Sequence, residues 1–475
     1  MIRNTNKITF WSVFFLWCGT LFSQTLTFSP YSRFGLGEMN SSAFAAANLS
    51  GGAFIGLKSD TAVPVYINAA NPAAVSGIRL TTFELGGTAQ FTEYNNGISK
   101  VKTHNINFNY GSLGFPLKQR ASACFGLMPY SSIGYNLQNT SANSIVGNIQ
   151  EQYSGNGGVN KAFLALAINP FKKSLQNFYR SANRDSLIKL KQTKEYKKKK
   201  FTKELLTELS IGGRVDYLFG NILHTSSIIY PTSTNYYHTR RYRALTISDF
   251  TGSFGLQTSF TIDSVSKREM RRKVKIGFGY FVSLPNTINV KSSTLGYNYS
   301  LGSFGDELPK DTFIYVSDKK GNIRLPIEQG IGISFKKGDL LAASMDAAYT
   351  GWKQFRYLDA VTEMKNSYRF AAGLCITPSK YSAGSGAYLK RVQYRIGGYY
   401  KTGFIELKNT DIADYGITAG FSFPVGLRMQ PAVVNLGVQL GELGSLNNNL
   451  LRERYARVIL GFTFNDKWFT KFRYD

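Results

Sequence analysis

The sequence predicts an all-β protein, a transmembrane antiparallel β-barrel of about 14 strands with an N-terminal hatch inside the lumen. Apolar and polar residues alternate with period two from about residue 80 to the end, and several such segments exceed the roughly 9–11 residues that a membrane strand needs. The chain is also rich in Gly, Tyr and Phe, with 46, 29 and 35 residues respectively. Glycines and aromatic rings are typical of membrane barrels.

The first residues have the pattern of a secretory signal peptide. Arg3 and Lys7 form a basic start, residues 8–22 form a continuous apolar run, and we expect cleavage at Ser23/Gln24. Residues 1–23 are therefore assigned to a signal peptide. Cys18 raises the alternative of a lipoprotein, but Trp17 stands where a small residue is required.

The formal net charge is +27, which in a cytoplasmic protein would point to nucleic acid. Secretion excludes that partner, and no Walker, zinc-finger or RNA-binding motif is present in the sequence. We expect no nucleic-acid partner, and we expect most of this charge to lie on a solvated surface.

Residues 79–475 are predicted to form the barrel. In residues 80–92 the apolar side chains share one face, and small polar ones such as Thr82, Thr88 and Gln90 share the other. An uncharged polar face suits a lumen better than the surface of a soluble sheet, so we expect an uncharged inner face. We expect strands to start near residues 79, 101, 121, 159, 207, 244, 274, 322, 340, 365, 392, 414, 430 and 453. Residues 138–158, 221–242 and 291–321 are expected to be long outer connections.

One inner connection, residues 171–206, is unusually long and basic. It includes the run Lys197, Lys198, Lys199 and Lys200, and its Leu, Lys, Gln and Glu content favours a helix. Three interpretations remain open: a solvated periplasmic insert, docking to an acidic protein partner, or attraction to anionic lipid head groups.

Residues 24–78 do not alternate, and we assign them to the hatch. They contain Gly51 and Gly52, followed about twenty residues later by Asn71, Pro72 and Ala73 at the entry to the first strand. This pattern resembles the FadL family of hydrophobic-compound transporters, to which PorV of type IX secretion is related. The resemblance implies a 14-stranded barrel whose N-terminal hatch gates passage at these five residues. Without it, Asn71-Pro72-Ala73 reads as a rigid structural turn.

Pro129 lies in the third predicted strand. A proline deletes one ladder hydrogen bond, so it predicts a bulge or kink, or else an ordinary strand end. The resemblance implies a kinked third strand with a lateral opening, which we place at Pro129.

Arg240, Arg241 and Arg243 lie among tyrosines at the outer end of a predicted strand. Guanidinium groups pair bidentately with phosphates, so we expect contact with lipopolysaccharide or the membrane interface. A generic aromatic girdle is the alternative.

The sequence does not predict an enzyme, a cofactor or a metal site. His104, His224 and His238 are scattered, and no catalytic triad or carboxylate pair stands out. We expect a multi-pass barrel in the outer membrane of a Gram-negative cell, surrounded by lipid and lipopolysaccharide. Two functions remain: passive transport of a small, fatty-acid-like hydrophobic compound, or a non-transporting subunit of an outer-membrane assembly or secretion complex, with periplasmic or outer-membrane protein partners.

Overall fold

The computed structural model describes residues 27–59, 66–118, 120–171, 194–231, 236–262, 274–302, 304–358, 360–361, 363–380, 382, 384–425, 432–466 and 468. The expected signal peptide lies outside the described residues. No helix among them is long and apolar enough to cross a membrane.

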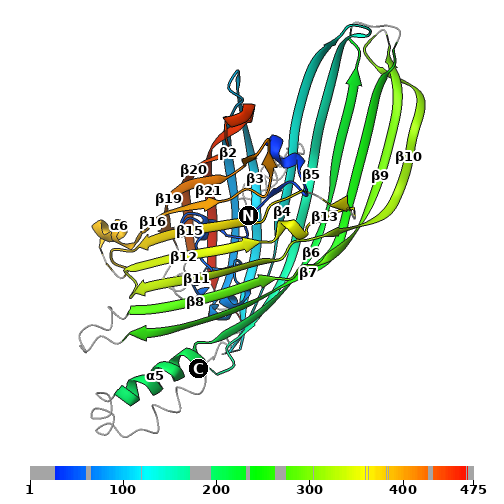
Figure 1. Cartoon of the computed structure of the whole chain (residues 1–475). Coiled ribbons are helices and arrows are strands. Elements are labelled where there is room, and N and C mark those ends of the chain that lie inside the picture. Colours follow the sequence, from blue (N-terminus) through cyan, green and yellow to red (C-terminus); the bar gives the residue numbers. More distant parts are fainter. Residues whose placement is uncertain are drawn as a thin grey trace, which may run out of the picture.

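The described residues form a closed antiparallel barrel of fourteen strands (Figure 1). The barrel closes because β2 pairs with both β3 and β21. The prediction of about fourteen strands in an antiparallel barrel is confirmed. The wall consists of β2 (Thr81–Asn95), β3 (Lys100–Lys118), β4 (Ala121–Asn143), β5 (Gly147–Ile168), β6 (Ser210–Ile229), β7 (His238–Ile262), β8 (Val274–Ser283), β11 (Glu328–Lys337), β12 (Leu341–Thr350), β15 (Ser367–Ile376), β16 (Gln393–Lys401), β19 (Asp414–Pro424), β20 (Ala432–Gly444) and β21 (Arg452–Asp466).

An apolar belt surrounds the barrel. Alternation turns every second side chain of each strand outward, and these outward residues are large and apolar although they are exposed. Such a surface is stable only against lipid, so the protein is a barrel of the outer membrane, as predicted. Typical members of the belt are Phe83, Phe125, Leu166, Val215, Phe254, Phe278, Ile333, Phe370, Ile396, Ile417, Leu436 and Leu460.

One side of the wall continues far beyond the belt (Figure 1). There β9 (Thr287–Leu301) and β10 (Glu307–Arg324) form a hairpin, and β9 pairs with residues 238–247 of β7. We call this outer sheet the fin: β9, β10 and residues 131–143, 147–159, 220–229 and 238–247 of β4 to β7. The expectation that residues 138–158, 221–242 and 291–321 are long connections is therefore wrong, because most of these residues are in strands.

The N-terminal segment lies inside the barrel. It contains η2 (Pro30–Arg33), β1 (Glu38–Met39), α2 (Ala45–Asn48) and η4 (Pro72–Gly77). Residues 43–59 and 66–78 are buried, except for Asn48 and Ala70 at intermediate exposure. We call residues 27–59 and 66–78 the lumen segment.

The remaining elements are short, apart from α5 in the basic insert. They are α5 (Lys194–Thr207), η6 (Trp352–Gln354), β13 (Arg356–Tyr357), β14 (Ala360–Val361), η7 (Ser385–Ala387), α6 (Tyr388–Arg391), β17 (Glu406–Leu407), β18 (Thr410–Asp411) and η8 (Asn447–Asn449).

Candidate functional site

Asn71 fixes the lumen segment to the barrel wall. Its side-chain oxygen accepts a hydrogen bond from Ala73 N at 3.0 Å and so caps η4, which starts at Pro72. Its Nδ2 lies 3.2–3.3 Å from the carbonyl oxygens of Ile55, Leu256 and Tyr280, on the lumen segment, β7 and β8. One side chain therefore joins two parts of the lumen segment to two wall strands.

Gly51 and Gly52 form the second attachment. Both have positive φ, at 66° and 71°, which glycine adopts without strain. Gly51 N donates to Thr418 Oγ1 at 2.9 Å, and Gly51 O accepts from Arg369 Nη2 at 2.8 Å. Arg369 Nη1 also donates to Gly52 O at 3.3 Å. The two glycines expose their backbone to the polar side chains of β15 and β19.

Two buried carboxylates complete the attachment. Asp346 Oδ2 on β12 accepts from the backbone nitrogens of Phe54 and Ile55, and Glu84 Oε1 on β2 accepts from Ile67 N at 2.8 Å. Both acids are almost fully buried. Buried backbone N–H groups need such partners. These acids were not predicted as site residues.

The expectation of an uncharged inner face is wrong. Ionisable side chains are buried on the inward face of the wall, and several of them bind the lumen segment: Arg395 donates to Ala46 O, Asp346 accepts from Phe54 N, and Lys161 donates to Ser42 Oγ. They include Glu84, Lys161, Asp216, Asp346, Arg395 and Glu453.

Inward glycines let the lumen segment approach the wall closely. A Cβ on Gly255 would lie 2.0 Å from Asn71 Oδ1, and a Cβ on Gly279 would lie 2.0 Å from Ile55 O. The same holds for Gly212, Gly332, Gly373 and Gly397, whose added Cβ would come within 2.6 Å of lumen-segment backbone. The glycine content of the strands thus reflects a filled lumen.

The barrel wall is split between β3 and β4. These strands pair only from Gly111↔Leu127 down to Lys118↔Ala121, whereas β3 continues along β2 and β4 continues along β5. Above Leu127 the described residues of the two strands form no ladder pairs. Ile106 and Phe108 are 66% and 58% exposed, so apolar side chains flank the split on the β3 side.

Pro129 lies at this split. The β4–β5 register shifts between Pro129 and Ser131, which leaves Tyr130 as the extra residue of a β-bulge. The predicted bulge is thus present in the strand. The missing N–H of proline explains why the ladder is interrupted here.

Strand β1 covers the split from inside. Glu38 pairs with Ser132 and Met39 pairs with Ser131, and Asn40 N donates to Tyr130 O at 3.0 Å. A polar cluster holds the other side of β1, where the Glu38 carboxylate lies 3.1 Å from Arg457 Nη2 and accepts from Thr27 Oγ1 at 2.9 Å.

A cavity of about 360 Å³ lies behind β1. Its lining mixes apolar and polar side chains, with Met128, Tyr130, Phe281 and Trp352 alongside charged groups. Pro129 and the Gly51-Gly52 pair line it as well. The charged lining residues are Glu38, Lys161, Arg214, Asp216, Glu328, Arg369, Lys401, Asp414 and Arg457.

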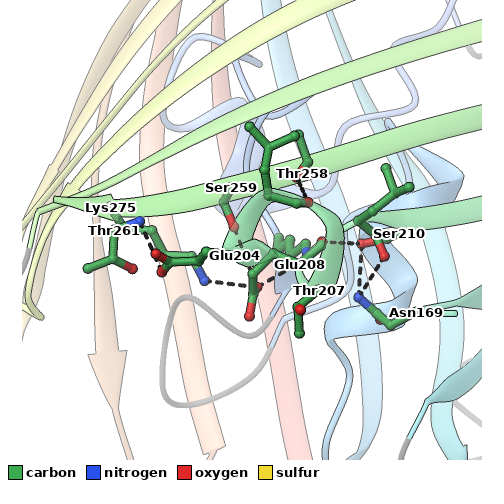
Figure 2. A network of polar contacts seen from close by, with 12 residues as sticks. Asn169, Glu204, Thr207, Glu208, Ser210, Thr258, Ser259, Thr261 and Lys275 are labelled. Carbon is green, nitrogen blue, oxygen red and sulfur yellow. Dashed lines mark hydrogen bonds and ion pairs between the residues drawn. The ribbon is translucent and has the colours of Figure 1, made fainter. Parts of the chain in front are cut away.

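Helix α5 is docked at the end of the barrel opposite the fin (Figure 1), through a network of polar contacts (Figure 2). Glu204 Oε1 accepts from Thr261 N at 3.1 Å, and Thr258 Oγ1 donates to Leu205 O at 2.6 Å. Phe201 packs edge-on against Phe260, with ring centroids 4.8 Å apart. The predicted helix is present, and its C-terminal part is tied to β7.

The structure separates the three predicted outer arginines. Arg240 faces away from the barrel axis, donates to Ser227 Oγ and forms an ion pair with Glu307. Arg241 and Arg243 line a cavity on the opposite face. Contact of all three with lipopolysaccharide stays a prediction. The side chains of Lys197, Lys198, Lys199 and Lys200 lie outside what the structure describes, so their docking role also stays a prediction.

Comparisons with known proteins place the chain as follows. The model of the BamG family matches residues 1–176 and 199–475. Among curated proteins, none matches the sequence. A FadL homologue from Pseudomonas aeruginosa is similar in structure, with a TM-score of 0.50, 10% identity and coverage of 91% of this chain and 99% of that chain. The toluene transporter TodX from Pseudomonas putida follows with a TM-score of 0.49, 12% identity and coverage of 91% and 99%. At these identities the likeness concerns the fold, and the FadL-like fold is confirmed.

Proposed function

The chain belongs to the BamG family. On that premise we propose that this outer-membrane barrel passes a small amphiphile from the outside into the outer leaflet. Such an amphiphile has an apolar chain and a polar head. The split between β3 and β4, closed by β1 with a cavity behind it, carries this proposal. A closed wall would leave no sideways path.

The lining of the cavity supports an amphiphile rather than a plain hydrocarbon. An apolar chain fits beside Met128 and Trp352, whereas a carboxylate or phosphate head fits near Arg369 or Lys161. A hydrocarbon offers these cationic groups no anionic partner, whereas the head of an amphiphile does. A fatty-acid-like compound has both parts.

The route requires movement of β1 alone. The rest of the lumen segment is fixed by Asn71, Gly51, Asp346 and Glu84, and these contacts oppose passage straight down into the periplasm. Strand β1 pairs with β4 over two residues only. Its displacement would open the cavity toward Ile106 and Phe108 at the lipid-facing rim.

A reversible cross-link across the split tests the proposal. Met39 and Ser131 are paired residues, so Met39→Cys/Ser131→Cys would lock β1 in place. Ala244→Cys/Ser293→Cys, a paired position on the fin, is the matched control. Uptake of radiolabelled oleate is measured in Gram-negative cells that lack their own fatty-acid transporter.

We expect oxidation to lower uptake about fivefold or more in the first variant and to leave the control unchanged, with recovery after reduction. Uptake no higher than in cells without the protein, or uptake indifferent to the locked β1, would rule out the sideways route.

A second function is favoured by α5, which transport does not require. A docked, basic helix at the periplasmic mouth suits a subunit that holds a partner protein in an outer-membrane complex. A photo-cross-linking residue at Thr202, which is exposed on α5, tests this. Deletion of residues 171–206 then separates the two functions: unchanged uptake favours transport, and loss of co-purifying partner proteins favours the subunit.

A further inference from the structure

A second cavity lies outside the membrane, on the inner face of the fin. It measures about 630 Å³ and is bounded by β4 to β7, by the start of the lumen segment, by Tyr357, Glu363 and Met364, and by residues 405–407. Arg243 is seven residues above Phe250 of the apolar belt, or about 23 Å along the strand. The cavity therefore opens above the lipid.

Two rows of paired residues build its floor. The first row runs from Tyr135 on β4 across Gly155 and His224 to Arg243 on β7. The second, two residues higher, runs from Leu137 across Tyr153 and Ser226 to Arg241. Period-two alternation turns all of these side chains to the same face.

Gly155 leaves room for the Tyr135 ring to extend across the first row to His224. A Cβ at this position would lie 2.2 Å from the ring of Tyr135, so the ring lies over the glycine. The Tyr135 hydroxyl lies 2.7 Å from His224 Nδ1, within hydrogen-bond distance. This contact fixes the position of His224 beside Arg243.

The cavity has an excess of positive charge. Arg33, Arg241 and Arg243 line it, and in the described part of the chain none of the three is ion-paired with a carboxylate. The acids at its rim are Glu363 and Glu406, and Glu406 is paired with Lys365 at 2.8 Å. Arg33 lies over the ring of Tyr153 at 5.1 Å, which leaves its N–H groups available at the edges.

We propose that this cavity binds a phosphomonoester on a sugar-sized ligand at the cell surface. Guanidinium groups bind phosphate through paired, charge-assisted hydrogen bonds, and Arg241 and Arg243 stand two residues apart on one strand face. The volume is in the range of small-ligand sites, about 300–1,000 Å³. This site is separate from the cavity behind β1 and does not depend on the proposed transport.

Binding to the purified, detergent-solubilised chain tests the site. The probes are glucose 6-phosphate and glucose for a soluble source, and lipid A with and without its phosphates for a lipid head group. Arg241→Gln/Arg243→Gln removes two charges from the cavity. Lys319→Gln/Lys320→Gln removes two exposed charges from β10 of the same fin and is the control.

We expect the phosphorylated member of at least one pair to bind about tenfold more tightly than its unphosphorylated partner. The arginine variant should lose that difference, and the lysine variant should keep it within about twofold. Preference for glucose 6-phosphate identifies a soluble ligand, and preference for phosphorylated lipid A alone identifies a head group. Equal binding of both members in both pairs, or a preference that survives the loss of both arginines, would refute the proposal. Heat-dependent gel mobility verifies that each variant is a folded barrel.

Discussion

The ammonium group of Lys58 lies 3.4 Å from the carboxylate of Glu208, 150 residues further along the chain. The same carboxylate lies 3.2 Å from Lys275 Nζ on β8. Lys58 belongs to the lumen segment, and Glu208 directly follows α5. This carboxylate therefore connects the interior of the barrel, the insert that contains α5, and the wall.

The docking of α5 should depend on pH only in the acid range. Burial alone would raise the pKa of Glu208, but Lys275 and Lys58 outweigh it and hold the pKa at about 2. A carboxyl whose folded pKa is depressed stabilises the docked state at every pH above its unfolded pKa, which is about 4.3 for glutamate. This stabilisation is lost as the pH falls toward the folded pKa. We expect docking to be constant from pH 7 to about 5 and to weaken from there toward about 2.

A spin label reports this transition. Thr202→Cys, in a chain with Cys124→Ser and Cys375→Ser, places a nitroxide on α5, and its mobility should increase only in the acid range. Glu208→Gln should raise the mobility already at pH 7 and remove the acid transition. A midpoint above pH 6, or one that persists in Glu208→Gln, would show that another group controls the docking.

Replacement of Asn71 should loosen the lumen segment. Asn71→Ala leaves Ala73 N and several carbonyl groups at the barrel wall without their partner, and each unsatisfied buried group costs about 1–3 kcal/mol. We expect the free energy of unfolding to fall by about 2 kcal/mol or more, as measured by urea titration in lipid vesicles. Asn139→Ala, on the exposed part of the fin, should change it by less than about 0.5 kcal/mol. Equal effects of the two changes would contradict the attachment through Asn71.

A methyl group at Gly51 should disturb the same segment for a different reason. The added Cβ would lie 2.6 Å from the carbonyl oxygens of Ala372 and Gly398, at a positive φ. Gly51→Ala should lower the midpoint of thermal unfolding by several degrees. Gly386→Ala has open space around the new methyl group and should leave the midpoint unchanged. A Gly51→Ala barrel as stable as the Gly386→Ala barrel would show that the lumen segment shifts freely.

The bulge at Pro129 should matter for passage more than for stability. Pro129→Ala supplies the missing N–H, so β4 can pair regularly with β5 and lose the bulge beside the split. If the proposed route is correct, oleate uptake should fall about twofold to threefold, while the urea midpoint should change little. Uptake above that of the unmodified protein would argue that the bulge restricts the opening.

Features set by neighbouring residues, such as a bulge or a helix cap, were predictable from the sequence. Hydrogen bonds between segments far apart in the sequence were not. The bulge at Pro129 follows from one missing N–H, and the cap at Asn71 follows from a side chain that reaches its own backbone two residues on. Asp346 and Glu84 bind backbone groups on another part of the chain, and no spacing rule connects Asp346 to Phe54. The sequence therefore indicated that the lumen is filled, but not what attaches the filling to the wall.

The fin was missed for another physical reason. Period-two alternation reveals a strand only where one face is apolar and the other polar. In β10, residues 308–313 are all exposed, so both faces meet water and the pattern disappears. Polar composition then resembled a loop.

The continuity of the fin with the barrel wall has a mechanical consequence. Strands β4 to β7 pass from the lipid zone to the outer sheet through unbroken runs of paired residues, apart from the bulge beside Pro129. The fin is therefore a rigid extension of the membrane-embedded wall and not a domain on a flexible linker. A ligand bound to the fin is held at a constant height and angle above the lipid surface. A force applied to the fin is transmitted to the strands of the barrel.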